Sequence, residues 1–147
     1  MENNDLTIQR LQEAMTRFYK AEWRQRPVRG LKRSEIRVLF CMMEGEKEGS
    51  KVKISEISKT LGVTTPTVTQ LVKELTANGY VERTTDPEDR RVAGIRLTDK
   101  GCQAAEEARD VFQCALNGLI EHLGREQSEQ LADLLNKAYQ YYSSLEI

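Results

Sequence analysis

The sequence lacks several features that define large classes of protein. No apolar run approaches the ~18 residues that a membrane-spanning helix needs. The start of the chain, Met1–Asp5, carries neither the basic nor the apolar region of a signal peptide. The three cysteines, Cys41, Cys102 and Cys114, are an odd and widely spaced set, which is a poor framework for disulfide bonds. These absences predict a reduced, cytoplasmic protein with no membrane partner.

Few residues are suited to catalysis or to metal binding. His122 is the only histidine, and no cluster of metal-ligating residues surrounds it in the sequence. The chain has no glycine-rich phosphate loop and no convincing pair of nucleophile and base. The sequence therefore predicts a protein that is not an enzyme and that uses no cofactor.

The cysteines also give little support for redox sensing, which needs a reactive thiolate beside a cation and usually a resolving cysteine. Cys102 and Cys114 lie twelve residues apart. One helix carrying both would separate them by a rise of about 18 Å, so they cannot pair within a subunit. We expect inert, buried thiols, with redox sensing as the alternative.

The net charge is close to zero, but the charged residues are unevenly distributed along the chain. The chain has 147 residues and a net charge of −1, with 39% apolar and 31% charged residues, which is enough for a core. Residues 9–37 hold nine Lys or Arg against three Asp or Glu, whereas residues 101–147 hold three against eight. This asymmetry predicts one face that attracts phosphates; unselected scatter is the alternative.

Two helices are predicted before the centre of the chain. The first, from Leu6 to Gln25, ends before Pro27 and has one apolar stripe: Ile8, Leu11, Met15 and Phe18. Ser34 is expected to cap the second helix. Its expected buried face is Ile36, Leu39, Phe40 and Met43. The polar run Glu44–Lys51 is expected to be a solvated loop.

Two more helices are predicted at the end of the chain. Thr98 can cap a helix that runs to about Leu123, and Gly124 separates it from the last one. Their stripes are Ala104, Ala108, Val111, Phe112, Ala115, Leu116, Leu119, Ile120 and Leu123, then Leu131, Leu134, Leu135, Ala138, Tyr142 and Leu145. One neighbour would hardly cover so much apolar surface, and exposing it is costly. We predict that the first and the last two helices form a homodimer interface; a self-contained helical bundle is the alternative.

The stretch from Ile54 to Gly101 begins with two short helices and a tight turn. Gly62 suits the left-handed conformation that ends a helix and turns the chain sharply, and Val63 would plug the angle. Thr65 is expected to cap the second helix, because Pro66 fits its first position and holds the preceding residue extended. Inward-facing residues would be Ile57 and Leu61 in the first helix, then Val68, Leu71, Val72 and Leu75 in the second. This pattern is typical of a helix-turn-helix.

The outward face of the second helix is suited to the major groove of DNA. It would present Thr65, Thr67, Thr69, Gln70 and Lys73. Threonines are small enough for close approach, glutamine can pair with adenine at two points, and lysine can reach guanine or a phosphate. The alternative is an ordinary helical corner with a solvated polar face.

A charged hairpin follows. The strands Tyr80–Arg83 and Gly94–Leu97 flank a loop that holds Asp89, Arg90 and Arg91. Arginines at the tip of a hairpin can enter a narrow minor groove, where negative potential is concentrated, and Asp89 can hold the guanidinium of Arg91 in place. The alternative is a solvated hairpin whose charges protect a sheet edge from aggregation.

These residues resemble a known family over nearly the whole chain. The helix-turn-helix pattern around Leu61-Gly62-Val63, the acidic-basic run Asp86-Pro87-Glu88-Asp89-Arg90-Arg91 and the sequence Leu97-Thr98-Asp99-Lys100-Gly101 are similar to those of MarR-type transcriptional regulators. The wing and the Leu-Thr-x-x-Gly sequence are the most specific part, since many regulators share a helix-turn-helix. Glu88 departs from the arginine often found at its position.

The resemblance implies a fold, a partner and a mechanism. The fold would be mainly α with a small β-hairpin (α+β), a winged helix-turn-helix in which residues 1–31 and 101–147 make the dimer and residues 32–100 bind DNA. A homodimer would bind pseudo-palindromic operator DNA, with the helix Thr65–Asn78 in the major groove and Arg91 in the minor groove. The DNA-binding residues would be Thr65, Pro66, Thr67, Thr69, Gln70, Lys73, Arg83, Asp89, Arg90 and Arg91.

Such regulators mostly repress, and they release DNA when a small phenolic or lipophilic effector or an oxidant acts on them. Residues that could line an effector pocket are Met15, Phe18, Tyr19, Trp23, Phe40 and Met43, although a core needs the same residue types. Two functions stay open: a ligand-responsive repressor that binds DNA, and a winged helix used only for protein contacts.

Overall fold

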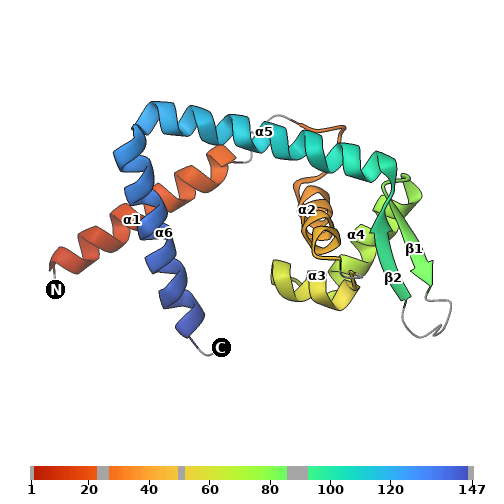
Figure 1. Ribbon diagram of the computed structural model, residues 1–147. Coiled ribbons are helices and arrows are strands. Elements are labelled where there is room, and N and C mark those ends of the chain that lie inside the picture. Colours follow the sequence, from red (N-terminus) through yellow and green to blue (C-terminus); the bar gives the residue numbers. More distant parts are fainter. Residues whose placement is uncertain (1, 23–26, 50–51, 86–92, 146–147) are drawn as a thin grey trace. The chain divides into compact units, whose positions relative to one another are not determined.

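A computed structural model describes residues 2–22, 27–49, 52–85 and 93–145 (Figure 1). Its elements follow the order α1 (Glu2–Glu22), α2 (Arg33–Lys47), α3 (Ile54–Leu61), α4 (Thr65–Ala77), β1 (Val81–Thr85), β2 (Ala93–Leu97), α5 (Asp99–Leu123) and α6 (Arg125–Ser144). The chain divides into two compact units, residues 1–31 and residues 32–147. This mostly helical structure with a two-stranded antiparallel hairpin confirms the predicted fold class.

The first unit contains α1, which begins four residues earlier than predicted. The acidic residue near its start, Asp5, is favourable beside the positive end of the helix dipole. The predicted apolar stripe is present but uncovered within the unit. All four of its members, Ile8, Leu11, Met15 and Phe18, are exposed, and so are the neighbouring Leu6 and Tyr19.

The core of the second unit lies where α2, α3, α4 and the start of α5 meet the hairpin. Its fully buried side chains come from several elements: Val38, Leu39 and Met42, Ile57, Val68, Val72 and Leu75, and Val81. Alanines on α5 complete the packing because their small side chains let helices approach closely: Ala104, Ala105 and Ala108. The buried face of α4 was predicted from its 3.6-residue period, although Leu71 is only half-buried.

The buried face of α2 is turned by about one residue from the prediction. Leu39 is buried as expected, but Val38 and Met42 accompany it, while Ile36, Phe40 and Met43 are half-buried. The six consecutive nonpolar residues of segment 38–43 define no single stripe. Packing against elements on several sides therefore decides which face is buried.

The ends of α2 also differ from the prediction. The cap is Lys32, whose backbone N–H donates to Glu35 Oε1 at 3.0 Å, so Ser34 lies inside the first turn. At the other end, Glu44 to Lys47 are helical and not a loop, because glutamate and lysine are good helix formers.

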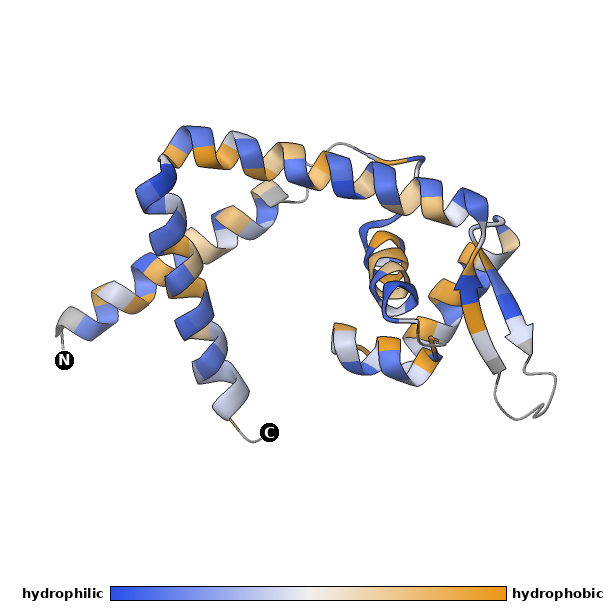
Figure 2. Ribbon diagram, in the orientation of Figure 1, coloured by the Kyte–Doolittle hydropathy of each residue, from blue (hydrophilic) through white to orange (hydrophobic). Residues whose placement is uncertain are grey.

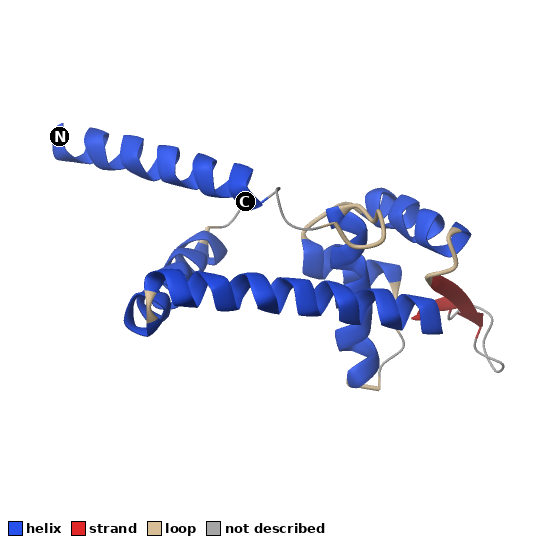
Figure 3. Cartoon of the chain, turned by 90° about the horizontal axis from the view of Figure 1, so that it is seen from above, coloured by secondary structure: helices blue, strands red, loops and turns tan. Residues whose placement is uncertain are grey.

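The second half of α5 and all of α6 expose apolar surface within their unit. Figure 2 shows apolar positions recurring along both helices, and α6 has no buried residue. Figure 3 shows α5 as one continuous helix. The large apolar residues exposed here are Phe112, Leu116 and Ile120 on α5, Leu134, Leu135, Tyr139, Tyr141 and Tyr142 on α6, and Leu145 at its end. Among the described residues, no helix is long and apolar enough to cross a membrane.

Candidate nucleic-acid interface

The turn between α3 and α4 has the geometry of a helix-turn-helix. Gly62 is left-handed, with φ 66° and ψ 31°, and ends α3, a conformation that favours glycine. The backbone N–H of Val63 donates to Ser58 O at 3.2 Å, and Ser58 Oγ donates to Val63 O at 2.5 Å. Ser58 thus closes the turn with two hydrogen bonds, a role that its place in the sequence does not reveal.

The N-cap of α4 is Thr64, one residue earlier than predicted. The Thr67 N–H donates to Thr64 Oγ1 at 3.4 Å, and the two hydroxyls lie 2.8 Å apart. Thr65 is therefore the first helical residue and Pro66 the second. Proline is tolerated there because the first N–H groups of a helix have no intrahelical partner. Two adjacent threonines offered the same capping chemistry, so the sequence did not separate them.

The outward face of α4 is exposed as predicted. Its exposed members are Thr65, Pro66, Thr67, Thr69, Gln70 and Lys73. Some of their polar groups make intrahelical bonds. Thr69 Oγ1 donates to Thr65 O at 2.9 Å, and Gln70 Nε2 donates to Glu74 Oε1 at 3.4 Å. A base that pairs with Gln70 would have to replace the contact with Glu74.

The wing is an antiparallel pair of strands. Val81 pairs with Leu97 and Arg83 with Ile95, and the side chain of Arg83, one of the predicted DNA-binding residues, is exposed. Arg96 makes an ion pair with Glu82 on the opposite strand. Among the predicted wing residues, Asp89, Arg90 and Arg91 lie outside the described residues.

Contacts made by Thr98 and Lys100 join the end of α4, the hairpin and α5. Thr98 caps α5 as predicted, accepting from the Gly101 N–H at 3.1 Å, and its Oγ1 donates to Gly79 O at 2.6 Å. Lys100 Nζ donates to Asn78 O at 2.7 Å and lies 4.4 Å from the centre of the Tyr80 ring. The sequence Leu-Thr-x-x-Gly therefore forms the joint that fixes the base of the wing.

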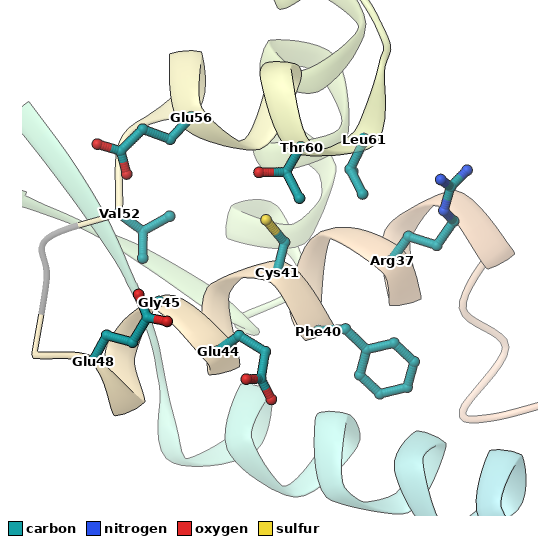
Figure 4. A pocket seen from close by; sticks show the side chains of 10 residues that line it. All are labelled: Arg37, Phe40, Cys41, Glu44, Gly45, Glu48, Val52, Glu56, Thr60 and Leu61. Atoms are coloured by element: carbon teal, nitrogen blue, oxygen red, sulfur yellow. The ribbon is translucent and has the colours of Figure 1, made fainter. Parts of the chain in front are cut away.

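A pocket of about 500 Å³ lies between α2 and α3 in the second unit (Figure 4). Its lining comprises Arg37, Phe40, Cys41, Glu44, Gly45, Glu48, Val52, Glu56, Thr60 and Leu61. Of the predicted effector residues, Phe40 belongs to this lining and Met43 does not. Met15, Phe18 and Tyr19 are exposed on α1, and Trp23 lies outside the described residues.

Two cysteines are more exposed than predicted. Cys102 and Cys114 are exposed and Cys41 is half-buried, so the expectation of buried thiols is wrong for the α5 pair. Burial raises the pKa of Cys41, the Thr60 hydrogen bond opposes this rise, and the Glu56 charge adds to it. Partial burial and then the carboxylates of Glu46, Asp99 and Glu106 raise the pKa of Cys102. Both thiols are therefore less ionised than a free cysteine. In the described part of the chain, no group of three potential ligands could hold a metal ion.

The fold and sequence match those of proteins that regulate transcription. A family model described as "MarR family" matches residues 29–92. The HTH-type transcriptional repressor IacR of Pseudomonas putida is 35% identical over 89 residues, which cover 58% of this chain and 51% of that protein. For the first curated relatives, the matched stretch spans 48% to 69% of their length.

Solved structures agree over most of the chain. Streptococcus pneumoniae FabT in complex with DNA is 25% identical, with a TM-score of 0.78, and the match covers 95% of this chain and 99% of that one. A Staphylococcus aureus MepR–DNA complex is 23% identical, with a TM-score of 0.73 and coverage of 88% and 96%. The winged helix-turn-helix with flanking N- and C-terminal helices is therefore shared.

Proposed function

This chain belongs to the MarR family of DNA-binding transcriptional regulators, a non-enzymatic family, and from this premise we propose that it is a repressor that binds a pseudo-palindromic operator as a homodimer. The observation that carries the proposal is the exposed face of α4. Threonines, Gln70 and Lys73 project there from a helix whose opposite side holds three fully buried residues. Buried Val68, Val72 and Leu75 hold the helix in place while its polar side faces outward.

In the proposed complex, α4 lies in the major groove. Gln70 reads adenine, Lys73 contacts guanine or a phosphate, and the threonines place hydroxyls near phosphates or methyl groups near thymine. Arg91, oriented by Asp89, enters the minor groove beside it, with Arg83 and Arg90 close to the backbone. Two such units related by a two-fold axis would place their recognition helices one DNA turn apart, about 34 Å.

The uncovered apolar residues support the homodimer. Exposed leucine, isoleucine and aromatic side chains recur along α1, on the second half of α5 and along α6. A monomer in water seldom carries so much apolar surface without a partner. We assign the three helices to the subunit interface.

We further propose that a small lipophilic or phenolic effector weakens DNA binding. The solved structures that match this fold include S. aureus MepR bound to ethidium and Streptomyces coelicolor PcaV with its natural ligand. Residues proposed to contact such an effector are Met15, Phe18, Tyr19, Trp23, Phe40 and Met43.

The test is selection of genomic fragments by the purified protein, followed by binding measurements across a series of salt concentrations. We expect a recurring operator with two-fold symmetry and an affinity that falls steeply as salt rises, because binding releases counterions from the phosphates. A protein-interaction module with the same fold would enrich no sequence and show no such salt dependence. That result would reject the proposed function.

A further inference from the structure

A carboxylate on α2 is bonded to the backbone of the wing. Glu46, in the last turn of α2, accepts a hydrogen bond at its Oε1 from the backbone N–H of Leu97 at 2.8 Å. The two residues are 51 positions apart in the chain, and Leu97 is the last residue of β2. Hydrogen bonds with a charged acceptor are stronger than neutral ones. This bond, called the tie below, therefore holds the end of α2 to β2.

The tie lies on the edge of β2 that faces away from β1. In an antiparallel pair, successive N–H groups of one strand point alternately toward its partner and away from it. Ile95 donates outward to Val52 O at 3.2 Å, and Leu97, two residues on, donates to Glu46. The carboxylate of Glu46 thus takes the place that a carbonyl of a third strand would occupy.

The surrounding packing keeps the end of α2 close to this edge. A Cβ added to Gly45 would lie 2.6 Å from Val52 Cγ2, so the helix and the residue that pairs with β2 approach without a side chain between them. Val52 is 3% exposed and Ile95 5%. Glu46 itself is half-buried, which limits competition by water for the Leu97 N–H.

A two-stranded hairpin is only marginally stable alone, and its direction depends on what holds its base. We propose that Glu46 is a positioning residue for the wing: its bond to Leu97 fixes the angle at which the hairpin leaves the domain and hence where its tip arginine meets the minor groove. This inference rests on the proposed function, and it assigns Glu46 no contact with DNA.

The test is a double-mutant cycle on operator affinity with Glu46→Ala, Arg91→Ala and both together. Loss of one well-placed groove contact costs roughly tenfold or more in affinity. We expect that loss of affinity for Arg91→Ala in the wild-type background. In the Glu46→Ala background we expect Arg91→Ala to lower the affinity by no more than about twofold, because the hairpin no longer holds the arginine at the minor groove. Substitutions at distant residues without shared partners normally have additive effects on free energy. Non-additive effects on operator affinity would therefore show that Glu46 positions the wing.

Three further variants make the result specific. Glu46→Gln keeps an acceptor oxygen of the same reach and should retain most of the Arg91 effect. Glu48→Ala removes the same charge from the same helix end, but Glu48 is not bonded to β2. The losses of affinity caused by Glu48→Ala and Arg91→Ala should therefore be additive. If Glu46→Ala does not fold, as judged by circular dichroism, Glu46→Met removes the carboxylate and keeps the length of the side chain.

Hydrogen exchange of the Leu97 amide in DNA-free protein gives an independent reading. The amide should exchange faster in Glu46→Ala and stay protected in Glu46→Gln. Unchanged exchange in Glu46→Ala, or an Arg91→Ala loss that is equal in both backgrounds, would overturn the proposal. If the wild-type protein bound no DNA, the proposed function would fail and the wing role with it, whereas faster Leu97 exchange would still show that the tie exists.

Discussion

At Gly101 the first turn of α5 passes so close to the residue before β1 that a side chain has no room. An added Cβ would lie 2.0 Å from Tyr80 O, a backbone atom held in place by its bond from the Thr98 N–H. The glycine of the Leu-Thr-x-x-Gly sequence is therefore explained by close backbone approach and not by an unusual φ angle.

We expect Gly101→Ala to destabilise the protein by roughly 1–3 kcal/mol or more, because the backbone must move to relieve the overlap. Gly118→Ala, on the same helix with nothing within 4 Å of the added Cβ, is the matched control and should stabilise by about 0.4–1 kcal/mol. Urea unfolding followed by circular dichroism measures both. Equal effects would show that the contact with Tyr80 O does not constrain this position.

Gln70 and Lys73 are expected to act differently on DNA. Gln70→Ala should cost roughly 1–3 kcal/mol and relax base preference at one position in each half-site. Lys73→Ala should weaken binding nearly uniformly across sequences and lower the salt slope by about one if it contacts a phosphate. Selection from randomised duplexes, combined with salt titration, separates the two outcomes; unchanged base preference in Gln70→Ala would remove it from base reading.

Cys102 should react slowly for an exposed thiol. Its pKa is raised, so the reactive thiolate is scarcer than in a free cysteine at pH 8, and alkylation by iodoacetamide should accelerate as pH rises through the raised pKa. The measurement uses a variant that carries Cys41→Ala and Cys114→Ala. Adding Glu106→Gln removes one of the carboxylates that raise the pKa and should speed the reaction at pH 8; no change would exclude that carboxylate as a cause.

Among the elements, those governed by local chemistry were the most predictable. Gly62 located the helix-turn-helix turn, Thr98 located the start of α5, and Gly124 located the break before α6. Predictions were wrong where neighbouring residues offered the same local chemistry. Two adjacent threonines could cap α4, and a continuous nonpolar run in α2 did not define which face is buried. The bond from Leu97 to Glu46 joins residues far apart in the chain, so no local pattern could reveal it.

The caps of α4 can be separated by mutation. Because Thr64 accepts the Thr67 N–H, Thr64→Ala should cost about 1 kcal/mol of folding stability. Thr65→Ala, one residue further on, removes no cap and should cost less, although its hydroxyl contacts Ser58 Oγ at 3.5 Å. Thermal and urea unfolding of the two variants give the comparison, and a larger loss for Thr65→Ala would show that Thr65, not Thr64, caps the helix.

For the whole molecule, the main expectation is a dimer. Light scattering at micromolar concentration should give twice the chain mass of 16.8 kDa. Leu135→Glu, which places a charge on an exposed apolar position of α6, should shift the population toward monomer. Gln130→Glu on the same helix adds the same charge at a polar position and should leave the dimer intact. A wild-type monomer would refute the assignment of the three helices to an interface.

The continuity of α5 gives the molecule a lever. Its first turn is tied to the end of α4 and to the base of the hairpin through Thr98, Lys100 and Gly101. Its 25 residues extend about 37 Å, so that a tilt of roughly 5° at one end displaces the other by about 3 Å. A small change of angle at the far end of α5 would therefore move α4 and the hairpin, the elements proposed to read DNA, by about the length of a hydrogen bond.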